Sequence, residues 1–176
     1  MIKDQHLMNF LPPLFNFRNE TSGMITSYRI NQSQIENTER PALVFLHGFN
    51  GSSKSWACQF AHFTSQTVIA IDAPGFGESQ PVDGGMVAIA DEVAALIASL
   101  VTGKVVIIGH SMGGMLAQVL GATHPDICQA IILSCTHKGR AQPVGSPLRA
   151  AERERIQERE VMDDASYGAL RVGKML

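Results

Sequence analysis

Short apolar runs and longer segments of helical periodicity alternate along most of this chain. Four runs have the continuous apolar composition of buried strands, at residues 41–46, 67–71, 105–108 and 128–134. Three segments repeat apolar residues at spacings of three and four and are predicted helices, at residues 53–63, 86–100 and 111–123. This alternation predicts an α/β fold, a mostly parallel sheet with helices on both faces.

Two further patterns flank this region. Residues 14–18 and 24–30 are strand-like and are separated by turn-forming residues, which predicts an N-terminal β-hairpin, and the polar run 31–40 is expected to be a loop. Near residue 140 the composition changes: residues 141–176 hold 12 charged residues, whereas residues 1–140 hold 18. Residues 149–161 and 165–176 are predicted to form two solvated helices.

Charge and cysteine content narrow the classes of partner and site. The formal net charge of −2 gives no reason to expect a nucleic acid or an anionic membrane as partner. Three cysteines without a C-x-x-C spacing argue against a disulfide framework or a zinc site and fit a reducing compartment. No N-terminal apolar run is long enough for a signal sequence or a membrane span. We therefore expect a cytoplasmic protein without a metal.

A serine flanked by glycines joins the strand at 105–108 to the following helix, in Gly109-His-Ser111-Met-Gly113. A catalytic serine hydroxyl must stand clear of its backbone, beside a base and beside amides that can receive an oxyanion. A sharp strand-to-helix turn meets this need by straining the serine backbone, provided that the residues two positions away are small. The pattern predicts a nucleophile elbow with Ser111 as nucleophile. The alternative is a glycine-rich turn whose serine has no catalytic role.

Two other predicted strands end in loops that would lie at the same edge of the sheet. The first ends in His47-Gly-Phe49-Asn-Gly51, whose glycines leave backbone amides free to face a ligand. The amide of Phe49 and the amide of Met112 are the candidate oxyanion donors, and the alternative is an ordinary loop with a packed His47. The second loop begins with Asp72, which we expect to anchor loop amides by hydrogen bonds. The alternative, that Asp72 is the catalytic acid, is disfavoured because Asp72 precedes the nucleophile in the chain.

These three motifs, Leu46-His-Gly-Phe49, Asp72-Ala-Pro-Gly-Phe-Gly-Glu-Ser79 and Gly109-His-Ser-Met-Gly-Gly114, resemble those of the α/β-hydrolase superfamily. The similarity is to the branch of enol-lactone hydrolases, C–C bond hydrolases, esterases and cofactor-free haloperoxidases. It implies that Ser111 is the nucleophile, that the amides of Phe49 and Met112 form the oxyanion hole, and that no cofactor is needed. His110 would be a structural neighbour of the elbow.

The chain also departs from the family pattern. Family members continue beyond this point with a helical lid, further strands, an Asp and finally a His. The resemblance therefore implies that residues 1–140 are the N-terminal part of the core and residues 141–176 the beginning of a helical cap. It also implies that the acid and the His are not in this chain. His137, after the last strand, is the best local candidate for a base, but without an acid it is more simply a hinge residue.

The sequence thus predicts a serine hydrolase of the α/β-hydrolase type with a small-molecule substrate. The substrate would be a carboxylic ester, an enol-lactone or a similar carbonyl compound, and the reaction would pass through an acyl-enzyme. We expect the 176-residue chain alone to be inactive, as an incomplete chain. The alternative is a noncatalytic remnant or binding module that retains the pocket without a base.

Overall fold

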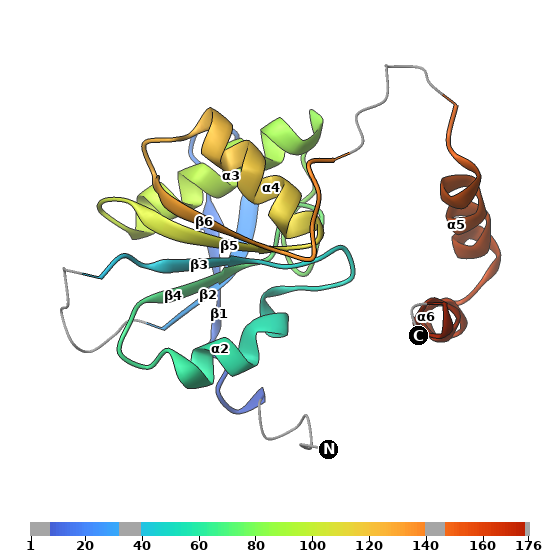
Figure 1. Ribbon diagram of the computed structural model, residues 1–176, viewed down its shortest axis with the longest axis horizontal. Helices are drawn as coiled ribbons and strands as arrows, with labels where there is room; N and C mark the ends of the chain where they lie inside the picture. The colour runs from blue at the N-terminus through green and yellow to red at the C-terminus, as the bar shows by residue number, and fades with distance from the viewer. Residues whose placement is uncertain (1–7, 32–39, 140–146, 175–176) are drawn as a thin grey trace. The chain divides into compact units, whose positions relative to one another are not determined.

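The computed structural model describes residues 8–31, 40–139 and 147–174 (Figure 1). The chain divides into two compact units, Met1–Gly139 and Arg140–Leu176. The strands of the first unit are β1 (Leu14–Arg18), β2 (Ile25–Asn31), β3 (Leu43–Leu46), β4 (Val68–Ile71), β5 (Val105–His110) and β6 (Cys128–Ser134). Its helices are a 3₁₀ turn, η1 (Ser53–Trp56), then α2 (Ala57–His62), α3 (Gly85–Leu100) and α4 (Met112–Thr123).

The six strands form one mixed sheet in the order β1-β2-β4-β3-β5-β6. The hairpin strands pair antiparallel, and β2 joins β4 antiparallel. The other four strands pair in parallel, and helical crossovers connect β3 to β4, β4 to β5 and β5 to β6 (Figure 1). The predicted mostly parallel α/β sheet with a leading hairpin is confirmed.

Helices cover both faces of the sheet, as the continuous apolar runs predict. In β3, Val44 and Leu46 belong to the core cluster that includes α3 and α4, while Leu43 and Phe45 belong to the cluster beneath α2. Alternate residues of a strand point to opposite faces, so a strand covered on both sides must be apolar at every position. All four residues of β3 and all four of β4 are buried for this reason.

The tight connection between β1 and β2 confirms the hairpin prediction. The amide of Asn19 donates to Met24 O at 2.9 Å, and the amide of Gly23 donates to Asn19 O at 2.7 Å. Gly23 adopts a φ of 75°, which a residue with a side chain rarely accepts. Most of the loop predicted at 31–40 lies outside the described residues, and Asn31 itself ends β2.

The helix predicted at 53–63 forms as two pieces, the 3₁₀ turn η1 followed by α2. Ser52 caps the first piece. Its hydroxyl accepts from the amide of Lys54, and its own amide donates to the hydroxyl of Ser55. This capping box satisfies the first backbone amides in a tight turn. Both pieces still present one apolar face, as predicted, with the ring of Trp56 packed 4.8 Å from that of Phe45.

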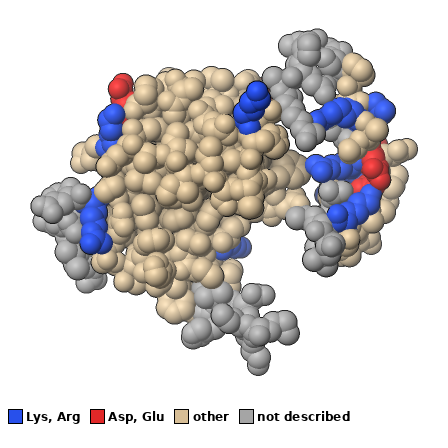
Figure 2. All heavy atoms as spheres, viewed as in Figure 1, with Lys and Arg blue, Asp and Glu red and all other residues tan. Residues whose placement is uncertain are grey.

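The second unit contains two helices, α5 (Ala150–Val161) and α6 (Asp164–Gly173). Lys174 binds Glu154 at 2.8 Å, and the guanidinium of Arg159 lies 5.6 Å from the ring centre of Tyr167. Figure 2 shows basic and acidic side chains close together on this unit, whereas the visible face of the first unit is largely uncharged. The two predicted solvated helices are confirmed, although the second ends at Gly173 within the described residues.

Candidate active site

Three of the sequence motifs lie at one edge of the sheet. Strand β3 pairs in parallel with β4 on one side and with β5 on the other. The carboxyl ends of these strands therefore lie side by side, and each is followed by a loop at that edge. This is the position at which α/β sheets bind their ligands.

Ser111 has a strained backbone at the turn from β5 to α4. Its φ is 52° and its ψ is −113°, and only one other non-glycine residue among those described has a positive φ. Such a conformation costs on the order of 1–3 kcal/mol. A Cβ atom on Gly109 would lie 2.3 Å from the carbonyl oxygen of Gly113, so the turn closes only around a glycine. Strain of this kind persists where neighbouring contacts hold it.

Glycines also bring the β3 loop into contact with the elbow. A Cβ atom on Gly113 would lie 2.2 Å from Leu46 O, so α4 begins directly against the end of β3. A Cβ atom on Gly48 would lie 3.4 Å from the Cβ of Ser111. The structure therefore brings the loop that contains Phe49 next to Ser111, as the candidate site requires.

His47 orients the peptide between Gly48 and Phe49. The ring is buried, and its Nε2 accepts from the amide of Ala73 at 3.1 Å, which leaves the proton of the neutral ring on Nδ1. Nδ1 donates to Gly48 O at 2.7 Å, and the amide of Gly51 donates to the same oxygen at 2.9 Å. In a trans peptide the N–H points opposite to the C=O, so the amide of Phe49 points away from His47.

Neither candidate oxyanion donor is engaged by the described part of the chain. The amide of Phe49 has no hydrogen-bond partner among the residues that the structure describes. The amide of Met112 opens α4, and the first amides of a helix have no partner within the helix. Both amides are therefore available to an external acceptor such as a substrate oxygen.

Burial lowers the pKa of His47 below its ordinary value, and this effect outweighs two opposing ones. The hydrogen bond to Gly48 and the charge of Asp72 both raise the pKa. The neutral ring also suits the hydrogen bonds, since protonated Nε2 could no longer accept from Ala73. The imidazole is thus a fixed neutral link between the ends of β3 and β4.

Asp72 anchors loop amides, as expected from the sequence. Its Oδ1 accepts from the amide of Ser53 at 2.5 Å and its Oδ2 accepts from the amide of Glu78 at 3.3 Å. A Cβ atom on Gly77 would lie 2.3 Å from Oδ2, and Gly77 has a φ of 55°, so the loop wraps tightly around the carboxylate. The carboxylate is committed to these amides and to no histidine among the described residues.

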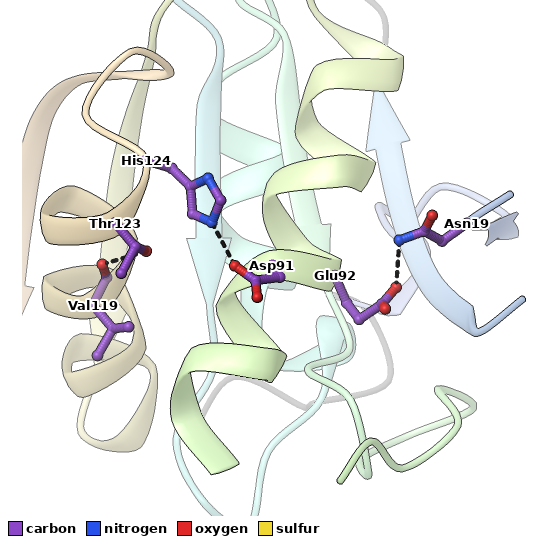
Figure 3. Close-up of polar contacts among 6 residues, drawn as sticks. All are labelled: Asn19, Asp91, Glu92, Val119, Thr123 and His124. Atoms are coloured by element: carbon purple, nitrogen blue, oxygen red, sulfur yellow. Dashed lines mark hydrogen bonds and ion pairs between the residues drawn. The ribbon is translucent and has the colours of Figure 1, made fainter. Parts of the chain in front are cut away.

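No described histidine is hydrogen-bonded to the hydroxyl of Ser111. Its Oγ has no hydrogen bond to any residue that the structure describes. His110 Nδ1 lies 3.5 Å from Ser134 Oγ, and the Nδ1 of His137 accepts from the amide of Gly139 at 3.0 Å. His124, at the end of α4, pairs with Asp91 of α3 at 2.8 Å, away from the elbow (Figure 3).

Two residues that contact the candidate site were not identified from the sequence. The ring of Phe76 lies edge-on between those of His47 and Phe49, at centroid distances of 5.4 and 5.7 Å. Thr136, after β6, donates its hydroxyl to the carbonyl oxygen of Ser111 at 2.6 Å. The only sequence signal for either was its position in a loop at the ligand-binding edge of the sheet.

The described residues include neither a cluster of potential metal ligands nor a membrane-spanning helix. No group of three or more His, Cys, Asp or Glu residues in that part of the chain could hold a metal ion. None of the helices there is long and apolar enough to cross a membrane.

The sequence of this chain is similar to those of known proteins. Residues 41–164 match the profile of the alpha/beta hydrolase fold. The chain is 32% identical over 137 residues to 2-succinyl-6-hydroxy-2,4-cyclohexadiene-1-carboxylate synthase of Enterobacter sp. (strain 638), a match that covers 72% of this chain and 52% of that protein. It is 29% identical over 107 residues to 2-(acetamidomethylene)succinate hydrolase of Mesorhizobium japonicum, covering 59% of this chain and 38% of that protein.

A solved structure also resembles this chain. A thermophilic esterase from Thermogutta terrifontis superposes with a TM-score of 0.66 at 27% identity, over 84% of this chain and 52% of the esterase. The chain spans about a third to a half of the length of the curated relatives it matches. The likeness therefore concerns one part of each relative.

Proposed function

This chain belongs to the alpha/beta hydrolase fold family, and from that premise we propose that Ser111 is the nucleophile of a serine hydrolase. In this proposal Oγ attacks a carbonyl carbon, and the amides of Phe49 and Met112 bind the oxygen that becomes negative. The tetrahedral intermediate collapses to an acyl-enzyme as the carbonyl carbon's bond to the alcohol or enol oxygen breaks, and the proton lost by Oγ ends on that oxygen. Water then attacks the acyl-enzyme, which regenerates Oγ–H and gives a carboxylic acid. The substrate would be a small carboxylic ester, an enol-lactone or a similar carbonyl compound, and no cofactor is required.

The observation that carries the proposal is the juxtaposition of a strained serine with a turned peptide. Ser111 has a φ of 52° beside a loop whose Gly48 carbonyl is held by His47 at 2.7 Å. The bond from His47 to Gly48 O directs the Phe49 amide away from His47. In this proposal, the strained backbone of Ser111 presents its hydroxyl beside that amide. Preorganised donors of this kind stabilise an oxyanion without reorganising during the reaction.

The names of relatives are consistent with carbonyl chemistry. One is a hydrolase of 2-(acetamidomethylene)succinate, and a structural neighbour at 27% identity is an esterase. Another relative is named a synthase, so the fold is shared among more than one reaction.

We further propose that residues 1–140 are the N-terminal part of the core and that residues 141–176 begin a helical cap. Three free cysteines, at positions 58, 128 and 135, support a reducing, cytoplasmic setting.

A second candidate is a noncatalytic binding module. It is favoured by the absence of a base on Ser111 Oγ among the described residues and by the engagement of His137 with its own loop. Such a module would keep the oxyanion amides as an anion-binding pocket without turning substrate over.

One experiment separates the two candidates. Ser111→Ala and the control Ser99→Ala are made in the protein as its native gene encodes it, and hydrolysis of p-nitrophenyl esters and enol-lactones is followed. Ser99 lies on α3 and donates to Leu96 O of the same helix at 2.7 Å, so its loss should leave turnover unchanged. The hydrolase proposal expects Ser111→Ala to remove nearly all turnover. Activity of that variant within about tenfold of the parent would refute it.

A further inference from the structure

Both backbone polar groups of Ser111, the residue before α4, are hydrogen-bonded by residues at the end of β6 and just after it. The amide of Ser111 donates to Ser134 O at 2.9 Å. The carbonyl oxygen of Ser111 accepts from the hydroxyl of Thr136 at 2.6 Å. Ser134, the last residue of β6, and Thr136, in the turn after it, therefore hold both the N–H and the C=O of the same strained residue.

The turn itself is built for this grip. Cys135, between the two contact residues, has a φ of 47° and is the second of the two described non-glycine residues with a positive φ. An L-residue seldom adopts this conformation, so it persists where the surroundings hold it. Here it lies between Ser134, whose carbonyl accepts from the Ser111 amide, and Thr136, whose hydroxyl donates to the Ser111 carbonyl.

Helix α4 supports the turn from the other side. The amide side chain of Gln118 donates to His137 O at 3.1 Å and to Gly114 O at 3.0 Å, which ties the turn to the first helical residues. A Cβ atom on Gly114 would lie 2.6 Å from the Cβ of Thr136, so the threonine packs directly on the helix backbone. The hydroxyl of Thr136 has two acceptors within reach, Ser111 O at 2.6 Å and His137 O at 3.4 Å, and the contact with Ser111 is the shorter.

From these contacts we infer that Thr136 is a positioning residue, which holds the Ser111 backbone in the conformation that presents its Oγ. The inference rests on the proposed function, in which Ser111 is the nucleophile. The carbonyl of Ser111 also accepts from the amides of Gly114 and Met115, at 3.0 and 3.2 Å. These bonds belong to the helix and would remain in a relaxed turn, whereas the Thr136 bond links the elbow to β6. Without the hydroxyl, the Ser111 carbonyl keeps only its bonds to the helix, and the elbow loses the bond that fixes Oγ relative to β6.

The test compares Thr136→Ala with Thr136→Ser in the protein as its native gene encodes it. The two variants differ only in the hydroxyl, so the difference between their rates isolates the hydrogen bond. Thr123→Ala is the matched control, because Thr123 also donates to a carbonyl of α4, that of Val119 at 2.9 Å, at the other end of the helix (Figure 3). The readouts are kcat, KM and the melting temperature.

We expect Thr136→Ala to lower kcat by about tenfold or more, because misplacement of a reacting group costs rate. KM should change by less than about twofold, because substrate binding is retained. Thr136→Ser should restore kcat, and Thr123→Ala should keep the parent kcat even where its melting temperature falls as far. If Thr136→Ala does not fold, Thr136→Val keeps the shape without the hydroxyl and is compared in the same way.

The outcomes distinguish this inference from the proposed function. Equal values of kcat for the Ala and Ser variants would overturn the positioning role, whether both are high or both low. If Ser111→Ala is inactive in the same assays, that result leaves the nucleophile assignment intact. Full activity of Ser111→Ala would instead overturn the proposed function, and the positioning role with it.

Discussion

Substitution of Gly113 by alanine tests the contact that joins the elbow to the sheet. The new Cβ would lie 2.2 Å from Leu46 O, and 2.5 Å from the carbon of that carbonyl. Real Cβ atoms essentially never approach another atom below 3.0 Å. The end of β3 and the start of α4 must therefore separate by roughly 0.8 Å, in an interior that is close-packed.

The expected cost follows from two opposing effects. Overpacking typically costs about 1–3 kcal/mol, and a clash with backbone belongs at the upper end because a strand cannot rotate away. Alanine in a helix recovers at most about 1 kcal/mol relative to glycine. We expect Gly113→Ala to lower the free energy of unfolding by about 2 kcal/mol.

Gly121 offers a control within the same helix. A Cβ atom there would lie 2.4 Å from Cδ1 of Ile131, the mobile end of a side chain, and its next contact is at 3.8 Å. A change of the Ile131 rotamer relieves this contact at small cost. Gly121→Ala should therefore leave the free energy of unfolding unchanged within about 1 kcal/mol, or raise it.

Urea unfolding followed by the fluorescence of Trp56 measures both variants. This tryptophan is the only one in the chain, and its ring packs on Phe45 of β3, the strand that the clash displaces. With a slope of about 1–3 kcal/mol per molar urea, a loss of about 2 kcal/mol moves the midpoint down by about 1 M. A midpoint for Gly113→Ala equal to or above that of Gly121→Ala would refute the reasoning.

Three other predictions follow from described residues. Because burial lowers the pKa of folded His47 below the unfolded value of 6.5, its contribution to stability is fully present above pH 6.5 and is lost as the pH falls through the folded pKa. Urea midpoints measured from pH 8 to pH 5 should fall less steeply in His47→Gln than in the parent, and equal slopes would contradict this. Ile132 and Leu133 of β6 are 53% and 47% exposed on a strand that pairs only with β5 among the described strands, so Ile132→Lys should reduce binding of a hydrophobic dye and slow aggregation, with unchanged fluorescence as the contrary result. The 176-residue chain by itself should hydrolyse p-nitrophenyl esters no faster than background and should not be labelled at Ser111 by an organophosphonate, whereas a burst with labelling would show that the chain holds its own base.

The course of the chain could be predicted where the physical cause is local. The alternation of buried strands with helices, the hairpin turn at residues 19–23 and the elbow at Ser111 all depend on spacings of a few residues. The split of the predicted 53–63 helix was missed because a capping box between Ser52 and Ser55 competes with simple periodicity. The nucleophile and the oxyanion donors Phe49 and Met112 remain predictions, as does the boundary at residue 140.

The α/β sheet, and the three loop motifs at one of its edges, could be predicted from the sequence alone, because strand burial and glycine spacing depend on neighbouring residues. The side chains that hold the loops at this edge of the sheet in place could be identified only from the tertiary structure. His47 bonds to Ala73, 26 residues away, and Thr136 bonds to Ser111, 25 residues away. Contacts between residues so far apart in the chain depend on strand order and register, which could not be predicted from the single sequence. The roles of His47 and Thr136 in holding these loops were therefore found only from the paired strands.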